Sequence, residues 1–382
     1  MKISVIGGGR WARTIASVLC GLPGRADRIT MPSPSNASGL QPWAARPQFG
    51  GRLSAVSTWP TPGTGPERPD AVIVANRVGD HFDAAAKALN SGIPVLVEKP
   101  VALSRGRIEQ LSRIANASST ALGASHVFLF ARYVEAYAAS VASLGRTQGL
   151  RLIWTDGASD IRRGEAKSYD PAVTLFDDVL PHVVPMVGEL QFGDLALVSL
   201  NVQRGGARLA IEARSNGRPV SLLIARNDQG RQRRIEIETD DRVATLDFAD
   251  EPGFIDIAGS RVNGDPRWDT ALRPLGTMLS AFIAAVEGAP LDPRLSPDRA
   301  IASAALADAI RSRYIAHQVE WLAKRIGEPL DPSLHYALAE FGANEAGNAD
   351  SISKAWPAIS SAAELKEFLA RSRLYSDAGY AR

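Results

Sequence analysis

The chain has 382 residues, 45% of them hydrophobic, and a formal net charge of +2 at pH 7. This length predicts two domains with room for an appendage, and the small charge argues against nucleic acid or a membrane as a partner. The single cysteine, Cys20, excludes a disulfide within the chain, and no apolar run is as long as a membrane span, so a cytoplasmic protein is expected.

The N-terminus contains a glycine-rich motif. A short apolar run, residues 2–6, leads into the sequence GGGRWA from Gly7 to Ala12, and a helix is predicted from Arg13 to Leu22. The motif fits the dinucleotide-binding pattern G-x-G-x-x-G/A in the context that this pattern needs, after a strand and before a helix. Gly7 permits the tight turn, Gly9 lets the backbone approach a pyrophosphate, and Ala12 keeps the helix close to the strand. A glycine-rich turn without a ligand is the alternative.

Apolar runs that alternate with helical segments follow this motif. The apolar runs are residues 28–31, 53–56, 71–75, 94–98 and 120–124, and the predicted helices are residues 81–91 and 105–115. The stretch from Pro32 to about Gly51, between the first two of these runs, is polar and rich in proline. This order indicates βαβ units, and therefore an α/β Rossmann domain with a doubly wound sheet over residues 1–125.

The pattern changes from about Ser125 onward. After a link into a helix at residues 126–142, short turns join alternating segments that predict antiparallel strands, and two helices follow. The strands are residues 149–155, 195–203, 207–214, 220–226, 234–239 and 242–248, and the helices are residues 275–286 and 297–323. An α+β domain with a mainly antiparallel open sheet is therefore expected over residues 126–326. Residues 327–382 form a C-terminal extension, in which a capping box from Ser361 to Glu364 predicts one last helix.

A second motif, Glu98-Lys99-Pro100, ends one of the apolar runs in the first domain. Ligands of open α/β sheets bind beyond the carboxyl ends of the strands, so Lys99 is predicted to direct its ammonium group into the cofactor crevice. Pro100 disfavours helix at Lys99. A solvated loop pair of Glu98 and Lys99 fits the same tripeptide.

A third motif places Asp178 four residues before His182. If a helix begins at Asp177 or Asp178, both side chains lie on one face and Pro181 falls in the first turn, where proline is tolerated. A carboxylate beside an imidazole orients it and raises its proton affinity, so His182 could exchange a proton with an alcohol or carbonyl oxygen. Alternatively, Asp178 is only an N-cap and His182 an ordinary helix residue.

The three motifs in this order resemble the Gfo/Idh/MocA family, which contains glucose–fructose oxidoreductase and inositol dehydrogenase. The resemblance covers residues 1–326. It implies an NAD(P)-dependent oxidoreductase that transfers hydride to or from a C=O or CH–OH group of a small, sugar- or polyol-like substrate, and it implies a homo-oligomer, a dimer or a tetramer. The catalytic residues are then Lys99, Asp178 and His182, with His182 as proton donor or acceptor. The candidate cofactor residues are Gly7, Gly9, Arg10, Trp11, Ala12, Ser33, Ser35, Asn76, Glu98 and Lys99.

The chain departs from the family pattern inside the third motif, where many members have small residues. Val179, Leu180 and Pro181 predict a bulkier and more apolar pocket wall, and Trp154 and Tyr169 are further candidate walls. Reduction of a C=N bond, such as an imine or a thiazoline in natural-product or siderophore assembly, is therefore an alternative reaction. A non-catalytic NADP-binding sensor is the alternative of another class.

The turn after the second apolar run indicates the type of nicotinamide cofactor. An acidic residue there would bind the ribose 2′-hydroxyl of NAD, but the sequence from Met31 to Asn36 contains none and offers Ser33 and Ser35. Arg10 in the glycine turn is a further candidate for contact with a 2′-phosphate. NADP(H) is therefore predicted in preference to NAD(H). No metal is expected, because none of the five histidines belongs to a metal-binding motif.

Overall fold

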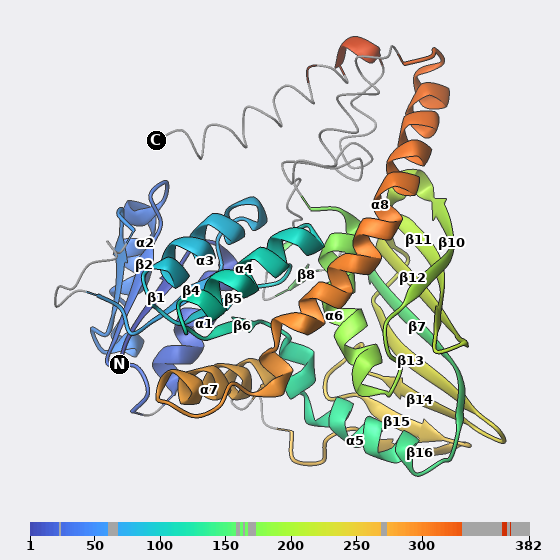
Figure 1. The fold of residues 1–382 in the computed structure, drawn as a ribbon, viewed down its shortest axis with the longest axis horizontal. Coiled ribbons are helices and arrows are strands. Elements are labelled where there is room, and N and C mark those ends of the chain that lie inside the picture. Colours follow the sequence, from blue (N-terminus) through green and yellow to red (C-terminus); the bar gives the residue numbers. More distant parts are fainter. Residues whose placement is uncertain are drawn as a thin grey trace. The chain divides into compact units, whose positions relative to one another are not determined.

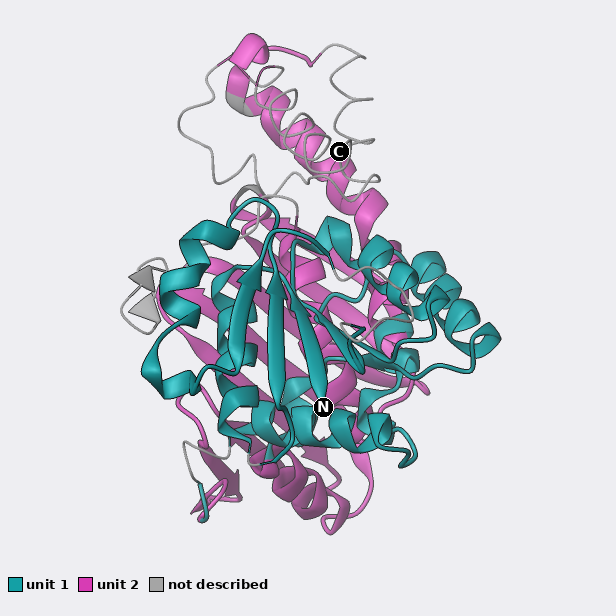
Figure 2. Cartoon of the chain, turned by 90° about the vertical axis from the view of Figure 1, so that its left-hand side faces the viewer, with its two compact units in different colours: residues 1–131, 267–301 teal, residues 132–266, 302–382 magenta. Residues whose placement is uncertain are grey.

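The computed structural model describes residues 1–22, 24–59, 68–157, 161–162, 165–166, 173–268, 273–330, 361–364 and 367. The chain folds into two units (Figure 2). The first unit contains residues 1–131 and 267–301, and the second contains residues 132–266 and 302–382. The sequence predicted consecutive domains and gave no sign that residues 267–301 belong to the first unit.

The first unit contains a six-stranded parallel sheet in the order β3-β2-β1-β4-β5-β6 (Figure 1). Its strands are β1 (Lys2–Ile6), β2 (Arg28–Pro32), β3 (Leu53–Val56), β4 (Ala71–Val74), β5 (Val95–Val97) and β6 (Leu122–Ala124). All side chains of β4 and β5 are buried, as expected for strands covered on both faces, which explains their continuous apolar sequence. The strand order is that of a Rossmann fold, so the predicted fold of this part is confirmed.

Helices cover this sheet on both faces, as right-handed crossovers to either side of β1 require. Helix α1 packs beside α7, and α3 packs beside α4 (Figure 1). The helices of the unit are α1 (Arg10–Gly21), α2 (Ala37–Ala44), α3 (His81–Asn90), α4 (Arg105–Ala117) and α7 (Pro274–Val286), with short 3-10 helices η1 (Pro47–Phe49), η2 (Val78–Asp80), η3 (Val127–Phe130) and η6 (Pro293–Leu295).

The polar, proline-rich stretch from Pro32 to Gly51, for which the sequence indicated no helix, contains α2 and η1. Leu40 and Ala44 are buried one helical turn apart, and α2 packs against β3. This packing holds a helix in which Pro42 removes one backbone donor.

The second unit contains an eight-stranded sheet in the order β10-β11-β12-β7-β13-β14-β15-β16. Neighbouring strands are antiparallel except for β12 and β7, which are parallel, so the mainly antiparallel sheet is confirmed. The strands are β7 (Thr147–Gly157), β10 (Ala196–Gln203), β11 (Arg208–Ser215), β12 (Arg218–Asp228), β13 (Gln232–Thr239), β14 (Val243–Asp247), β15 (Phe254–Ile257) and β16 (Ser260–Asn263), and β8 (Ile161–Arg162) pairs separately with β9 (Glu165–Ala166).

One face of this sheet is buried. Alternate residues of β12, Val220, Leu222 and Ile224, are inaccessible, and the sheet packs against α5 (Arg132–Ala142) and α6 (Leu175–Glu189). Helix α8 (Pro297–Ile326) and the short η4 (Arg204–Gly206) complete the described helices of this part. Because only one face of the sheet is covered, apolar and polar residues alternate along such strands. This alternation is the pattern from which the strands were predicted.

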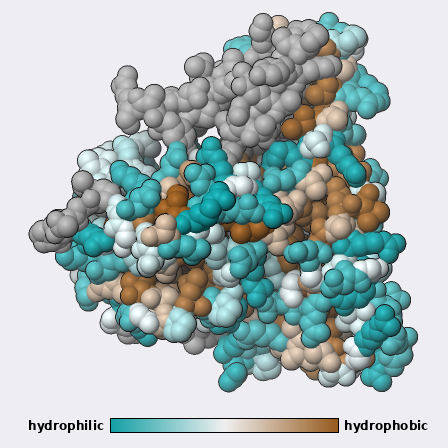
Figure 3. All heavy atoms as spheres, viewed as in Figure 1, coloured by the Kyte–Doolittle hydropathy of each residue, from teal (hydrophilic) through white to brown (hydrophobic). Residues whose placement is uncertain are grey.

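The surface is mixed. In the view of Figure 3, hydrophilic side chains predominate around smaller apolar patches. No helix among the described residues has the length and apolar character needed to cross a membrane. In the C-terminal extension, most of which lies outside the described residues, the Glu364 N–H donates to Ser361 Oγ over 3.2 Å, as the capping box predicts.

Candidate active site

The glycine turn links β1 to α1. Gly7 has a φ of +127°, and a Cβ at this position would lie 2.5 Å from the Ala75 carbonyl oxygen, so both its conformation and its surroundings require glycine. Gly9 is the N-cap of α1, and no atom of the described residues lies within 4 Å of a Cβ built on it. Ala12 is completely buried. Open space beside a helix N-terminus fits the approach of a pyrophosphate.

Glu98 connects this turn to the ends of β5 and β6. Its Oε1 accepts a hydrogen bond from Ser125 Oγ over 2.6 Å, its Oε2 accepts from the Lys99 N–H over 3.2 Å, and the Trp11 side chain also hydrogen-bonds to it. Burial raises the pKa of the Glu98 carboxyl above its ordinary value, and the bonds from Ser125 and Trp11 oppose this shift. The solvated loop pair is therefore excluded for Glu98, whereas Lys99 is half-buried.

Asn76 follows β4 and has an unsatisfied acceptor. Its Oδ1 is buried and has no hydrogen-bond partner among the described residues. The ring of the buried His81 lies close to the backbone here. Its Nε2 is 3.3 Å from the backbone carbonyl oxygen of Asn76, and its Nδ1 is 2.8 Å from that of Pro100. An unpaired buried acceptor is costly, so the Asn76 side chain fits a hydrogen-bond donor that a ligand would bring. Together with the glycine turn, this position fits a dinucleotide.

The turn after β2 lies beside the glycine turn. Ser33 is buried, and a Cβ at Gly8 would lie 2.5 Å from Ser33 Oγ. Ser35 is exposed, and Arg10 is the first residue of α1. The structure thus brings Ser33 next to the predicted phosphate site, while the roles of Ser35 and Arg10 stay predictions.

In the second unit, α6 carries the third motif, and its start differs from the prediction. The helix begins at Leu175 with Thr174 as N-cap, not at Asp177 or Asp178. Thr174 Oγ1 accepts from the Asp177 N–H over 3.0 Å and donates to Asp177 Oδ2 over 2.6 Å. Pro181 therefore lies beyond the first turn, where burial of the surrounding helix compensates for its missing donor.

The two acidic residues at this helix start have different partners. Both oxygens of the buried Asp177 accept from the Arg311 guanidinium, over 2.9 and 3.0 Å. Asp178 Oδ2 lies 3.2 Å from Arg226 Nη2, and its side chain is 25% exposed. Asp178 is therefore not the N-cap, and it is the aspartate of this pair that reaches solvent.

His182 lies one turn after Asp178 on α6, so both side chains belong to one helix face. Its ring stacks on the indole of Trp154, with centroids 5.3 Å apart and 18° between the planes. The Arg233 guanidinium lies 3.9 Å from the centroid of the same indole and forms an ion pair with the buried Asp156. Trp154 thus contacts the predicted proton-transfer residue, while Tyr169 lies outside the described residues.

The sequence motifs did not indicate the arginines that support this helix. Arg226 comes from β12 and Arg311 from α8, far from the motif in the sequence. The signal that could have indicated them is the pair of adjacent aspartates in a mostly apolar helix, because buried carboxylates need counter-ions.

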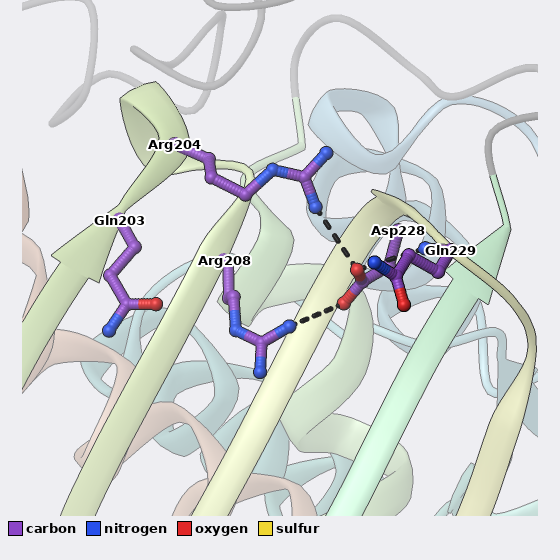
Figure 4. Close-up of a pocket in the computed structure, with 5 residues that line it drawn as sticks. All are labelled: Gln203, Arg204, Arg208, Asp228 and Gln229. Atoms are coloured by element: carbon purple, nitrogen blue, oxygen red, sulfur yellow. Dashed lines mark hydrogen bonds and ion pairs between the residues drawn. The ribbon is translucent and has the colours of Figure 1, made fainter.

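The second unit also contains a cavity of about 540 Å³, which residues of β10, η4, β11 and β12 line (Figure 4). Asp228 accepts from Arg204 Nη1 over 3.2 Å and from Arg208 Nη1 over 2.7 Å, and these residues line it with Gln203 and Gln229. The predicted catalytic residues are not among the described residues around it. The described residues also include no cluster of histidine, cysteine, aspartate and glutamate that could hold a metal.

The fold and the glycine turn are those of a nucleotide-binding domain. Residues 1–126 match the GFO_IDH_MocA family model, described as an oxidoreductase family with an NAD-binding Rossmann fold. Over these residues the match confirms the predicted resemblance to the Gfo/Idh/MocA oxidoreductases, and the third motif lies outside them. The comparison with curated proteins gives no match.

Solved structures share the fold at low identity. A putative oxidoreductase from Magnetospirillum magnetotacticum is 22% identical, with a TM-score of 0.63 and coverage of 81% of this chain and 99% of that one. The UDP-N-acetylglucosamine 3-dehydrogenase GnnA from Acidithiobacillus ferrooxidans is 19% identical (TM-score 0.63, coverage 82% and 97%). The 3-ketoreductase KijD10 from Actinomadura kijaniata, in complex with NADP and TDP-benzene, is 17% identical (TM-score 0.66, coverage 82% and 97%).

Proposed function

We propose that this protein is an NADP(H)-preferring oxidoreductase that transfers hydride to or from a C=O or CH–OH group of a sugar- or polyol-like substrate. The observation that carries the proposal is the arrangement on α6, where Asp178 and His182 share a face and the His182 ring stacks on Trp154. An imidazole held in one orientation beside a carboxylate is suited to proton exchange with a substrate oxygen.

Each unit contributes its own part of the reaction. The glycine turn and Asn76 bind the cofactor, and the nicotinamide, when bound, supplies or accepts the hydride. During reduction His182 gives its proton to the carbonyl oxygen, and during oxidation it takes the proton from the hydroxyl group. The Lys99 ammonium group stabilises the negative charge that develops on this oxygen. The proposal requires Lys99 and His182 to act on one substrate.

The sugar part of a nucleotide sugar is the substrate class that we favour. GnnA is named for UDP-N-acetylglucosamine, and KijD10 was solved with TDP-benzene, which supports testing this class first. Reduction of C=N rested on apolar residues within the third motif. Val179, Leu180 and Pro181 are buried, so core packing accounts for them and no observation favours that reaction.

The preference for NADP(H) is supported by the turn after β2, which has hydroxyl groups and no carboxylate between Met31 and Asn36. KijD10, with a similar fold, was solved with NADP. A homo-oligomer and a cytoplasmic location stay predictions of the sequence.

Cofactor turnover tests the proposal. The purified protein is incubated with NADP⁺ or NAD⁺ and with UDP-N-acetylglucosamine, TDP-glucose, inositol or glucose, and formation of the reduced cofactor is followed by absorbance. We expect turnover with a nucleotide sugar, and a higher kcat/KM with NADP⁺ than with NAD⁺. Tight cofactor binding without turnover of any sugar, polyol or corresponding ketone would instead support a non-catalytic sensor.

A further inference from the structure

Arg226 is a buried cation at the start of α6. Its side chain is 2% exposed and donates to the Val173 and Thr174 carbonyl oxygens over 3.3 and 3.1 Å, and to Asp178 Oδ2 over 3.2 Å. Arginine stays protonated in proteins, so its burial is favourable only with a compensating anion. Of these three partners, Asp178 is the one that carries a charge.

The contacts of Arg226 fix the position of the Asp178 carboxylate. Val173 and Thr174 directly precede α6, so the guanidinium is tied to the backbone at the point where the helix begins. Asp178 lies in the first turn and is bonded to the same guanidinium through Oδ2. The carboxylate is thereby held at a set place one turn before His182, and its partial exposure leaves it accessible from solvent.

The neighbouring aspartate shows what a purely structural pair looks like in this helix. Asp177 is 3% exposed and both its oxygens accept from Arg311, while Thr174 donates a further bond to it. Its hydrogen-bonding capacity is used inside the protein. The Asp178–Arg226 pair has the same charges but keeps the carboxylate partly exposed.

We propose that Arg226 is a positioning residue: it holds Asp178 as a fixed anion that binds substrate and orients His182, and it leaves proton exchange to His182. This inference rests on the proposed hydride-transfer function. A carboxylate bonded to a guanidinium is a poor proton donor, whereas it is a strong acceptor for a substrate hydroxyl group. The pair of Arg226 and Asp178 therefore fixes which of Asp178 and His182 carries the proton.

A double-mutant cycle tests the coupling in catalysis. Arg226→Gln should lower kcat/KM by about 10- to 100-fold, because a small displacement of a reacting group is costly. Because Arg226 acts through Asp178, the double variant Arg226→Gln/Asp178→Asn should be no slower than Asp178→Asn alone. Arg226→Lys should keep more activity than Arg226→Gln, since lysine keeps the positive charge but lacks the planar guanidinium group with its several N–H donors. If the fold losses in kcat/KM of the two single variants multiply in the double variant, the proposal is wrong.

The matched control is Arg311→Gln, which breaks the adjacent buried pair. It should lower Tm while kcat of the folded protein stays within about 3-fold of wild type, since Asp177 is not proposed to contact substrate. If Arg311→Gln lowers kcat as much as Arg226→Gln at an equal loss of Tm, general loosening of α6 explains both, and the proposal is wrong.

A stability cycle needs no turnover. Asp178→Asn removes the charged partner that the buried Arg226 has on α6 and should lower Tm, and adding Arg226→Gln should recover part of that loss. Additive losses of Tm would show that the two residues are not a pair and would overturn the inference. Absence of turnover by the wild-type protein contradicts the proposed function instead, and leaves this cycle to decide the pairing.

Discussion

The imidazole of His182 lies flat against the indole of Trp154, with ring centroids 5.3 Å apart. The indole is only 5% exposed, and Arg233, its neighbour on β13, places a guanidinium against it. The surface under the imidazole is therefore rigid. A fixed ring plane limits the directions from which His182 can exchange a proton, which is the property that a general acid or base needs.

Replacing Trp154 should affect catalysis according to the shape that remains. Trp154→Phe keeps a flat face and should lower kcat by less than about 10-fold, while Trp154→Leu should lower it by about 10- to 100-fold. Both variants should lower Tm, because the side chain is buried. The control Trp43→Leu removes another aromatic contact, to Phe49, and should lower Tm alone. Full activity of Trp154→Leu would show that the stacking does not position His182.

Lys99 is expected to matter for catalysis more than for folding. Lys99→Met should lower kcat by about 100-fold or more, because it removes the charge that we propose stabilises the substrate oxygen. Its Tm should change little, since the side chain is only half-buried. Steady-state kinetics and thermal unfolding measure both effects, with the exposed Lys324→Met as control. A large loss of Tm with intact kinetics would mark Lys99 as structural.

The N-cap of α6 should contribute to stability. Thr174→Val removes the bond from the Asp177 N–H and the bond to the Asp177 carboxylate, and should lower the free energy of unfolding by about 1–2 kcal/mol. Thr174→Ser keeps the hydroxyl group and should recover most of this loss. Urea unfolding followed by circular dichroism gives the values. An unchanged midpoint and slope in Thr174→Val would contradict the assigned cap.

Glu98 should make stability depend on pH. Burial raises the pKa of its carboxyl in the folded protein above the ordinary value of 4.5. The folded state therefore binds more protons than the unfolded state above that pH, so the contribution of Glu98 is present at low pH and is lost as pH rises towards the folded pKa. Glu98→Gln does not titrate. The free energy of unfolding of the variant, relative to wild type, should therefore rise over this window and level off above it.

Urea unfolding at several pH values from about 4 to about 7.5 measures this difference. Glu109→Gln on α4 makes the same carboxyl-to-amide change at a half-buried position and serves as the matched control. A difference between Glu98→Gln and wild type that stays constant across the range would mean that Glu98 titrates alike in the folded and unfolded chains.

The fold was predictable where burial imposes a simple pattern. Strands β4 and β5, covered on both faces, have continuous apolar sequences, and β12 alternates because one face is covered. Helix α2 was missed, because Pro42 and the polar residues around it resemble a loop and only the contact with β3 reveals its apolar face. Local patterns do not report such packing.

The motifs of the candidate site were predictable from the sequence, whereas the arginines that hold its aspartates were not. The spacing of Asp178 and His182 places them on one helix face without knowledge of the rest of the chain. Arg226 and Arg311 lie 48 and 134 residues from the aspartates that they hold, so only the folded structure brings them there. The start of α6 was misplaced because the prediction put Pro181 in the first turn, whereas Thr174 is the N-cap and the buried helix accommodates Pro181 beyond that turn.

The central claim is that His182 carries the proton during hydride transfer. The most direct test is the rate of a single turnover of bound NADPH with a nucleotide-linked ketosugar, in wild type and His182→Ala, together with the Kd for NADPH. We expect His182→Ala to slow this step by about 100-fold or more and to leave the Kd for NADPH unchanged. Equal single-turnover rates in the two proteins would contradict it.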